Sequence, residues 1–252
     1  MVSDIDSATV TATLTLSNIA AGSLNTATSG AVTSTYNAGT GVWSASGAIA
    51  DVNALLAGLT FTPAANFNSN FTIATSVSDG VAAAITGSKA MTGTPVNDAP
   101  TATNLSAAET YVEDTALNLV DIVVSDVDSA NGTATLTLSD IAAGSLNTGT
   151  SGAVTSTYNA GTGVWTASGA IADVNALLAG LTFTPSLNYN SNFTIATSVD
   201  DGVAAAITGS KAMTGTPVND APTATNLSAA ETYVEDTALN LVDIVVTDVD
   251  SA

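Results

Sequence analysis

The feature that most constrains this chain is an internal repeat with a period of 122 residues. Trp43 recurs as Trp165, and the Pro-Val-Asn-Asp-Ala-Pro run at 95–100 recurs one period later. When residues 1–130 are aligned with 123–252, only twelve positions differ, and most of the differences are conservative. This period is too long for one turn of a solenoid and fits one whole domain. The chain is therefore predicted to be an array of similar domains.

Within each repeat, short stretches alternate polar and apolar residues with a period of two, as half-buried strands do. In the first repeat these stretches lie at 11–16, 31–36, 42–45, 59–62 and 71–77. A short helix is expected at 51–57, with Asp51 as its N-cap and Gly58 ending it. Short antiparallel strands at this spacing, with one short helix per domain, predict an all-β fold of tandem Ig-like β-sandwich domains with Greek-key connections.

The prolines mark the boundaries between repeats, because proline fixes φ and is excluded from central strands. With 95–100 as a linker, residues 95–216 form one complete domain. Residues 1–94 form a domain that lacks its first strands, and 217–252 are the first strands of a further domain. Two explanations stay open for these ends. The chain is a window of a longer protein, or 217–252 of one chain complete 1–94 of the next by donor-strand pairing, giving a head-to-tail fibre.

The composition excludes most kinds of chemistry. The chain has 22 Asp and Glu residues against two lysines, no arginine, histidine or cysteine, and a formal net charge of −20. Without His or Cys there is no Ser-His-Asp or Cys-His arrangement, and no zinc, haem or iron–sulfur site of the usual kind. Neither nucleic-acid binding nor membrane insertion is expected, because basic residues are too few and no apolar run approaches about 18 residues. Hard cations and paired carboxylates remain.

The carboxylates form a set that recurs in each period. In the middle repeat the set comprises Asn97, Asp98, Glu113, Asp114, Asp126, Asp128, Asp200 and Asp201. Its counterparts in the other repeats include Asp4, Asp6, Asp79, Asn219, Asp220, Asp248 and Asp250. Like charges at one point cost free energy unless a cation bridges them, and Ca²⁺ takes six to eight oxygen ligands. The set is consistent with Ca²⁺ sites, and equally with solvated loop acids that only keep the surface polar.

A resemblance to a known family adds to this pattern. Val-Glu-Asp-Thr at 112–115, followed by the Asp-Val-Asp-Ser-Ala-Asn-Gly run at 126–132, resembles the opening of a cadherin repeat. Ser-Val-Asp-Asp-Gly at 198–202 and the linker at 217–222 resemble its closing motifs. The ordered set, through Asp-Val-Asp at 248–250, is similar to the cadherin-like tandem repeats of giant bacterial surface adhesins of the RTX and VCBS type. The resemblance covers the whole chain and implies cadherin-like domains with Ca²⁺ at their junctions.

The same resemblance assigns ligands to each junction. The junction at 217–222 would use Glu113, Asn219, Asp220, Asp248 and Asp250. The junction at 95–100 would use Asn97, Asp98, Asp126, Asp128 and Asp201, and the first tip keeps Asp4, Asp6 and Asp79. The family's mid-domain Leu-Asp-Arg-Glu motif and the second Asn of its linker are absent. Fewer ions per junction are therefore expected than in animal cadherins.

The function implied by the resemblance is an extracellular structural spacer of a bacterial adhesin, fibre or biofilm protein, stiffened by Ca²⁺ at the linkers. Its partners would be neighbouring repeats of the same chain or identical chains head to tail, and no motif indicates an adhesion ligand. The alternative is a Ca²⁺-independent Ig-like subunit of a surface filament or sheath, which polymerises by donor-strand complementation.

Two further classes are weighed against the spacer. A glycosidase needs only two carboxylates, but such enzymes normally also have a cleft with aromatic platforms, and aromatic residues make up only 5% of this chain. No enzyme activity is therefore expected. A carbohydrate-binding module would need exposed aromatic residues on one face, whereas Trp43 and Trp165 lie on repeated strands where core packing is the default.

Overall fold

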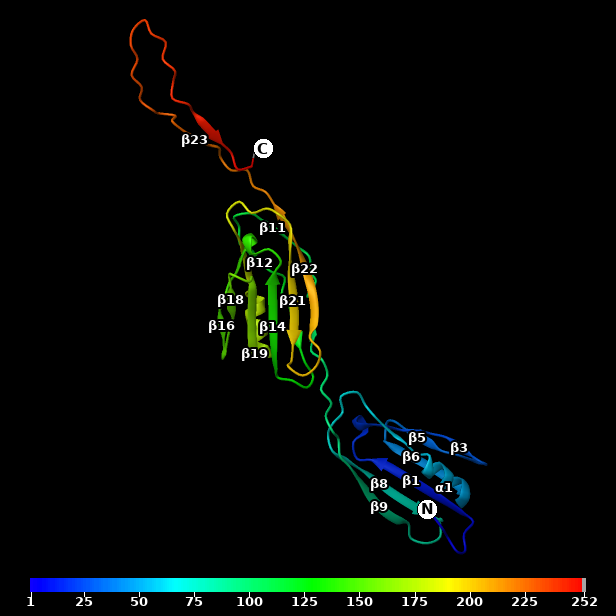
Figure 1. The fold of residues 1–252 in the computed structure, drawn as a ribbon. Coiled ribbons are helices and arrows are strands. Elements are labelled where there is room, and N and C mark those ends of the chain that lie inside the picture. Colours follow the sequence, from blue (N-terminus) through cyan, green and yellow to red (C-terminus); the bar gives the residue numbers. More distant parts are fainter. Residues whose placement is uncertain (251–252) are drawn as a thin grey trace. The chain divides into compact units, whose positions relative to one another are not determined.

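The structure is a computed structural model that describes residues 1–250 (Figure 1). It consists of two compact units, unit 1 at Met1–Val96 and unit 2 from Asn97 onward. The boundary lies inside the proline-containing run at 95–100, which the sequence marks as a linker. The segment from 217 onward groups with unit 2, so its assignment to a further domain stays a prediction.

Unit 1 is all-β apart from two short helical segments. Its strands are β1 (Thr9–Leu16), β2 (Gly22–Leu24), β3 (Thr28–Ser29), β4 (Val32–Thr33), β5 (Thr35–Asn37), β6 (Val42–Ala48), β7 (Phe61–Pro63), β8 (Phe71–Ser78) and β9 (Ile85–Met91), with helix α1 at Ile49–Ala57 and a 3-10 turn at Ile19–Ala21. The main sheet is antiparallel in the order β5-β6-β1-β8-β9, while β2 pairs with β7 and β3 with β4. Helix α1 packs against β1, β3 and β6.

Unit 2 repeats this arrangement and adds strands at its edges. Its elements are β10 (Thr101–Ala102), β11 (Glu109–Val112), β12 (Leu117–Asn118), β13 (Val124–Ser125), β14 (Asn131–Leu138), a 3-10 turn (Ile141–Ala143), β15 (Gly144–Leu146), β16 (Thr150–Ser151), β17 (Val154–Thr155), β18 (Thr157–Asn159), β19 (Val164–Ala170), α2 (Ile171–Ala179), β20 (Thr182–Pro185), β21 (Phe193–Asp200), β22 (Ile207–Thr216), β23 (Thr223–Thr225) and β24 (Val245–Thr247). Its main sheet has the order β11-β22-β21-β14-β19-β18, and a second sheet has the order β12-β20-β15. The remaining pairs are β10 with β13, β16 with β17, and β23 with β24.

The alternating sequence pattern accounts for the core of each unit. Along β14 every second side chain is buried, and Leu136 lies opposite Trp165 on the neighbouring strand β19. Both residues are 1% exposed and belong to the core of unit 2, as Leu14 and Trp43 belong to that of unit 1. The prediction of an all-β fold built from β-sandwich domains, with one short helix in each of units 1 and 2, is confirmed.

Two local predictions are wrong. The stretch 31–36 is two strands instead of one. The buried Ser34 accepts a hydrogen bond from Ala27 N (2.9 Å) and separates β4, which pairs with β3, from β5, which pairs with β6. Helix α1 begins at Ile49, after Ala48, so Asp51 is not its N-cap. Asp51 lies in the first turn and accepts a hydrogen bond from the Ser29 hydroxyl (3.2 Å), which ties the helix to β3.

Unit 2 also buries an ion pair in its apolar interior. Lys211 Nζ on β22 lies 2.8 Å from Glu109 Oε1 on β11, and the two side chains are 0% and 4% exposed. Lys211 also donates to the Val120 carbonyl (3.1 Å), and the Val120 N–H donates to the Glu109 carboxylate (3.1 Å). A buried charge needs its counter-ion, so this pair fixes the position of β11 beside β22.

A hydrogen bond between Tyr189 and Asp140 distinguishes unit 2 from unit 1. The Tyr189 hydroxyl donates to Asp140 Oδ2 (2.8 Å), whereas unit 1 has Phe67 and Asn18 at the two positions, so both partners differ together. Burial raises the pKa of Tyr189 to about 12, and its bond to Asp140 adds to the shift.

The ionisation of Tyr189 is therefore expected well above that of an ordinary tyrosine, whose pKa is about 10. Because the folded pKa is raised, the stabilisation is present below about pH 10 and is lost as the pH rises through the folded pKa. Tyr189→Phe should remove one step from the most alkaline part of a tyrosinate absorbance titration. Removal of a step near pH 10 instead would contradict this account.

Candidate calcium-binding sites

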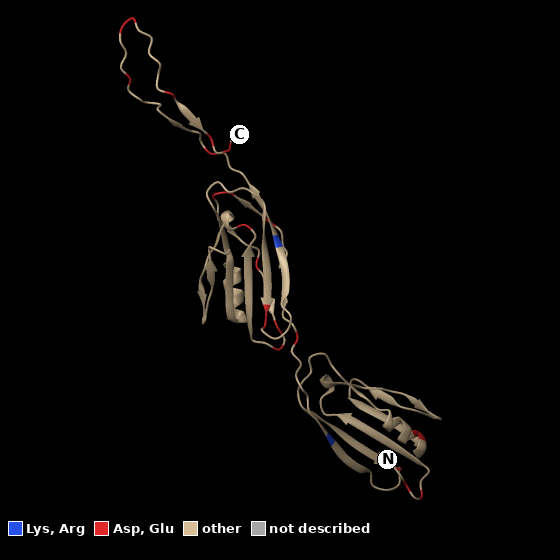
Figure 2. Cartoon of the chain, in the orientation of Figure 1, with Lys and Arg blue, Asp and Glu red and all other residues tan. Residues whose placement is uncertain are grey.

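The first cluster of acids lies in unit 2 beside the linker, where three loops meet. Asp126 and Asp128 follow β13 in the turn that leads into β14, and Asp201 follows β21 in the turn to β22. Asn97 and Asp98 approach them from the linker. Figure 2 shows the acidic residues gathered in such loops and at strand ends.

Hydrogen bonds join the linker to both turns. Asn97 Nδ2 donates to Asp201 Oδ2 (2.6 Å), and the Asp98 N–H donates to Asp128 Oδ2 (2.7 Å). Asp201 Oδ1 accepts from two backbone N–H groups of its own turn. The bond from Asn97, followed by those N–H groups, holds the pKa of Asp201 below its usual range. Four of the five residues predicted for this junction are thus hydrogen-bonded in two pairs, Asn97 with Asp201 and Asp98 with Asp128.

The fifth residue, Asp126, has one carboxylate oxygen without a partner. Its Oδ1 accepts from the Asp128 and Ser129 N–H groups (2.8 and 2.7 Å), which folds the turn around the carboxylate. Its Oδ2 is buried and accepts no hydrogen bond from the protein. An ionised oxygen shielded from water without a donor is costly, and a bound cation removes that cost.

The second cluster lies at the opposite end of unit 2, around Glu113. This side chain is 1% exposed and accepts hydrogen bonds from Asn190 Nδ2 (3.0 Å) and from the Val218 N–H. It therefore fixes the start of the linker that carries Asn219 and Asp220.

Beyond that linker, the Asp220 N–H donates to Asp250, and the Asp250 N–H donates to Asp248 Oδ1 (3.0 Å). Asp220 Oδ2 is buried and unpartnered, as is the Asn188 Oδ1 that lines the same hollow of about 390 Å³ with Asp248. Desolvation, followed by the charges of Asp250 and nearby acids, raises the pKa of Asp220. This end of unit 2 is thus an anionic hollow with two oxygen ligands free.

The sequence places Asp114 among the recurring acids, but neither it nor Asn188 and Asn190 was predicted as a member of this second cluster. Asp114 Oδ1 accepts from the Asn188 N–H (2.9 Å), which places the Asn188 side chain in the hollow. The available signal was the alternation of asparagines at 188, 190 and 192, in which amide oxygens recur at one turn. Such a run of asparagines does not by itself predict a site, because only the fold brings Glu113 beside it.

The tip of unit 1 carries the reduced set Asp4, Asp6 and Asp79. Asp4 Oδ1 accepts from the Asp6 and Ser7 N–H groups (3.0 and 2.9 Å), the same turn that Asp126 forms in unit 2. Asp4 and Asp79 line one small hollow of about 80 Å³. The Asp4 carboxylate raises the pKa of Asp6, mainly through a side-chain hydrogen bond and then through its charge. The tip of unit 1 therefore preserves the geometry of the turn without the linker.

Across residues 1–250, no three His, Cys, Asp or Glu side chains lie close enough together to hold a metal ion by themselves. Each predicted junction set has four carboxylates and one asparagine, but no three of the described carboxylates are close enough together, so a cation there would need neutral oxygen ligands as well. Ca²⁺ accepts such mixed oxygen sets.

In the same described residues, no helix has the length and apolar character needed to cross a membrane.

Solved structures that match the chain include extracellular domains of cadherins. The human CDH23 EC21–23 structure is 15% identical, with a TM-score of 0.45, and the match covers 96% of this chain and 69% of that one. Protocadherin Gamma B2 extracellular domains 1–5 are 13% identical, with a TM-score of 0.39 and 95% of this chain covered. This chain spans 40% of that structure and 52% of protocadherin Gamma B2 domains 3–6. No protein-family model and no curated protein matches the sequence. The all-β assignment rests on the strands and sheets described above.

Proposed function

We propose that this chain is an extracellular structural spacer, built from tandem β-sandwich repeats of the kind found in bacterial surface adhesins, whose domain junctions bind Ca²⁺. The observation that carries the proposal is the pair of buried, unpartnered carboxylate oxygens on Asp126 and Asp220, one beside each proline-containing linker. Asp126 and Asp220 are not equivalent positions of the repeat. What they share is their place at a domain junction, so we attribute the unpartnered oxygens to the junction. A Ca²⁺ ion supplies the positive charge that these oxygens lack.

The residues that would hold the ion are the ones that already connect linker to tip. At the first junction these are Asn97, Asp98, Asp126, Asp128 and Asp201, and at the second they are Glu113, Asn219, Asp220, Asp248 and Asp250. Without a cation, these carboxylates repel one another across a short hinge. With one, the linker and both turns share a single centre, and a chain of domains on flexible hinges becomes stiffer. The same charge neutralisation lowers the net charge of the working protein below 20 in magnitude.

Calcium is expected to stabilise unit 2. Extracellular Ca²⁺ modules bind with Kd values of about 10⁻⁴–10⁻³ M. At a Ca²⁺ concentration about 100 times Kd, linkage adds about 2.7 kcal/mol to the free energy of unfolding, which raises the Tm by roughly 10 °C. The measurement is thermal unfolding followed by Trp165 fluorescence, with a chelator and with increasing Ca²⁺. Small-angle scattering should show a more extended chain in Ca²⁺ than in chelator.

The matched variants are Asp126→Asn and Asp121→Asn. The first removes charge from the buried, unpartnered carboxylate and should weaken Ca²⁺ binding about tenfold or more, whereas Asp121 has an exposed side chain whose loss should leave binding unchanged. Equal Tm values in Ca²⁺ and chelator would overturn the Ca²⁺ proposal.

That outcome would leave the second candidate function, a Ca²⁺-independent subunit of a surface filament or sheath. It is favoured by one observation, namely that Asp201 and Asp128 already accept hydrogen bonds from the linker. In that case protein donors alone stiffen the junction, and the acids otherwise keep the surface polar.

A further inference from the structure

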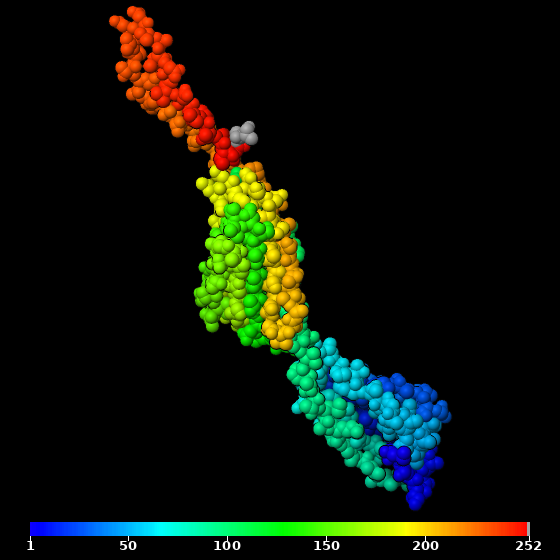
Figure 3. All heavy atoms as spheres, in the orientation of Figure 1, coloured from blue at the N-terminus to red at the C-terminus, as the bar shows by residue number. Residues whose placement is uncertain are grey.

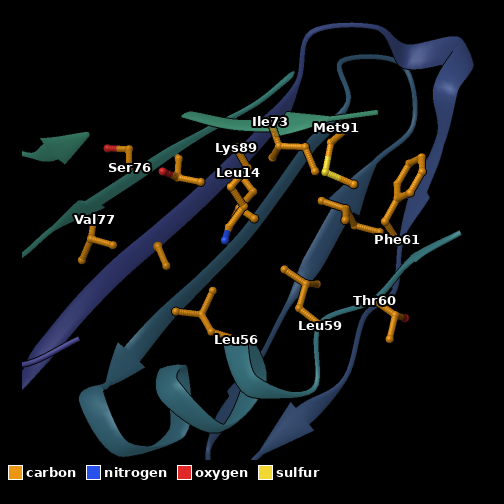
Figure 4. A pocket seen from close by; sticks show the side chains of 13 residues that line it. Leu14, Leu56, Leu59, Thr60, Phe61, Ile73, Ser76, Val77, Lys89 and Met91 are labelled. Carbon is orange, nitrogen blue, oxygen red and sulfur yellow. The ribbon is translucent and has the colours of Figure 1, made fainter. Parts of the chain in front are cut away.

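Unit 1 carries an open apolar groove with a volume of about 520 Å³. Figure 3 shows it as a hollow in the surface of unit 1, and Figure 4 shows the side chains that line it, which come from the main sheet, from β7 and from helix α1. Its lining includes Leu14, Leu59, Phe61, Ile73, Met91 and one charged residue, Lys89. Lys89 is exposed and has no side-chain partner among the described residues. An apolar groove around an unpaired lysine is an unusual surface for a soluble domain.

The same residues are fully covered in unit 2. Phe183, Lys211 and Met213, which are equivalent to Phe61, Lys89 and Met91, are at most 1% exposed. These residues are covered by the segment 105–122, which contains β11 and β12 and precedes β14, the equivalent of β1, in the sequence. Tyr111 of this segment is 1% exposed and packs edge-on against Phe183 and Phe193, with ring centroids 5.3 and 5.8 Å away.

The edge of the main sheet differs in the same way. In unit 2, β11 pairs in parallel with β22 from Glu109 opposite Met213 to Val112 opposite Thr216. Among the described residues, no strand pairs with the outer edge of β9, the equivalent of β22. A Cβ added at Gly209 on β22 would lie 2.7 Å from the Leu105 carbonyl oxygen, whereas one added at Gly87 on β9 meets only Thr75 Oγ1, at 3.1 Å. The outer edge of β9 is therefore open.

A second copy of the covering segment lies at 223–246, with the same sequence as 101–124. It has the same backbone turns, with Asn226 and Asp236 at φ 63° and 56° where Asn104 and Asp114 have 60° and 58°. The Val242 N–H donates to Glu231 Oε1 (2.9 Å), as the Val120 N–H does to Glu109. The segment is thus already shaped as in the covered unit, which reduces the entropy cost of binding.

The apolar side chains of this segment are exposed. Tyr233 is 76% exposed, against 1% for its equivalent Tyr111, and the exposed aliphatic residues include Leu227, Leu241 and Ile244. The sequence therefore contains both an uncovered apolar groove, in unit 1, and a segment at 223–246 that matches the cover of the equivalent groove but is itself exposed.

We propose that residues 223–246 of a second copy of this chain bind in the groove of unit 1 and add a strand to the edge of β9. The register follows from the 122-residue offset. Tyr233 enters between Phe61 and Phe71, and the Glu231 carboxylate meets Lys89 Nζ, as Glu109 meets Lys211 in unit 2. Strand addition supplies backbone hydrogen bonds, and the buried ion pair fixes the register. The groove and the segment are different surfaces, so the contact is heterologous and can repeat head to tail.

The first test is the mass of the full-length chain at rising protein concentration, measured by sedimentation velocity and light scattering. The expected result is a series of dimers, trimers and longer species that grows with concentration and does not require Ca²⁺. A chain that stays monomeric at every concentration overturns the proposal, whether the groove stays open or is filled from within the same chain.

Charge reversal provides the decisive variants. Lys89→Glu and Glu231→Lys each place like charges together in the buried position. Each variant alone should therefore associate at least about 100-fold more weakly than the parent chain. In an equimolar mixture, the segment of the Glu231→Lys chain meets the groove of the Lys89→Glu chain with opposite charges. The segment of the Lys89→Glu chain still carries Glu231 and meets Lys89 in the groove of the Glu231→Lys chain, so the second contact is matched as well. The mixture should therefore form long species in which the two chains alternate, although neither chain associates alone. The chain with both substitutions should again form long species.

The matched control is Asp243→Lys, which reverses an exposed charge in the same segment whose carboxylate makes no contact. It should associate like the parent chain. If Glu231→Lys associates as well as Asp243→Lys, or if the mixture stays monomeric, the proposed register is wrong. A steric variant tests the groove without any change in charge. Gly87→Ala should leave unit 1 folded by Trp43 fluorescence while weakening association by about 5- to 100-fold.

Discussion

Replacing Lys211 by methionine is expected to lower the free energy of unfolding of unit 2 by about 3–5 kcal/mol. The substitution keeps most of the apolar stem but leaves the Glu109 carboxylate buried with no counter-ion and only the Val120 N–H as a donor. Since an unpaired buried charge cannot regain its hydration, β11 should detach from β22 at lower denaturant concentration. Urea unfolding in a Trp43→Phe background measures this, because Trp165 then reports on unit 2 alone.

The chain contains its own control for this prediction. Lys89→Met makes the same substitution one repeat earlier, where the lysine is exposed, and should change stability by less than about 0.5 kcal/mol in dilute protein. It is read in a Trp165→Phe background. Equal losses for Lys89→Met and Lys211→Met would show that the buried pair contributes nothing specific. Glu109→Leu combined with Lys211→Met should recover most of the stability, because it leaves no buried charge.

Replacing Phe183 by alanine is expected to cost unit 2 about 3–5 kcal/mol. Phe183 is 0% exposed and packs against Tyr111 and Phe193, so the substitution creates a cavity beside these two rings. The equivalent Phe61 of unit 1 is only half-buried in the open groove. Phe61→Ala should therefore cost no more than about half as much, since less apolar area is returned to water.

Urea unfolding in the same two reporter backgrounds compares the pair. Both measurements belong at protein concentrations where the chain is monomeric, because association covers Phe61. If Phe61→Ala costs as much as Phe183→Ala under those conditions, the groove is closed in solution. A rise in the cost of Phe61→Ala with protein concentration would instead match the proposed filling of the groove.

The long strands were predictable from the sequence, whereas several short elements were not. In β14 the alternation runs over eight residues, and burial of every second one follows directly from the pleat. Strands of two residues, such as β10 and β13, have no period to detect. The break at Ser34 depends on a hydrogen bond with Ala27, which only the folded chain brings together.

For the candidate sites, spacing identified the carboxylates but not their surroundings. Asp128 and Asp201 are 73 residues apart, and their convergence on the linker residues Asp98 and Asn97 required the turn positions that the strands determine. Asn188 was missed because its place in the hollow depends on Asp114, far away in sequence. The different burial of Lys89 and Lys211 could not be predicted either. Their sequence neighbours are the same, and the difference comes from Glu109, which lies 102 positions before Lys211.

The parallel pairing of β11 with β22 determines how unit 2 bears tension. These are the first long strand and the last strand of its main sheet, and they run side by side in the same direction. A pull on the two ends of the unit therefore slides one strand along the other, so that the hydrogen bonds between them are loaded together in shear and do not open one after another. The buried Lys211–Glu109 pair lies at this seam and would have to break in the same event. Resistance of a unit to stretching is then set by its rate of forced unfolding rather than by its equilibrium stability.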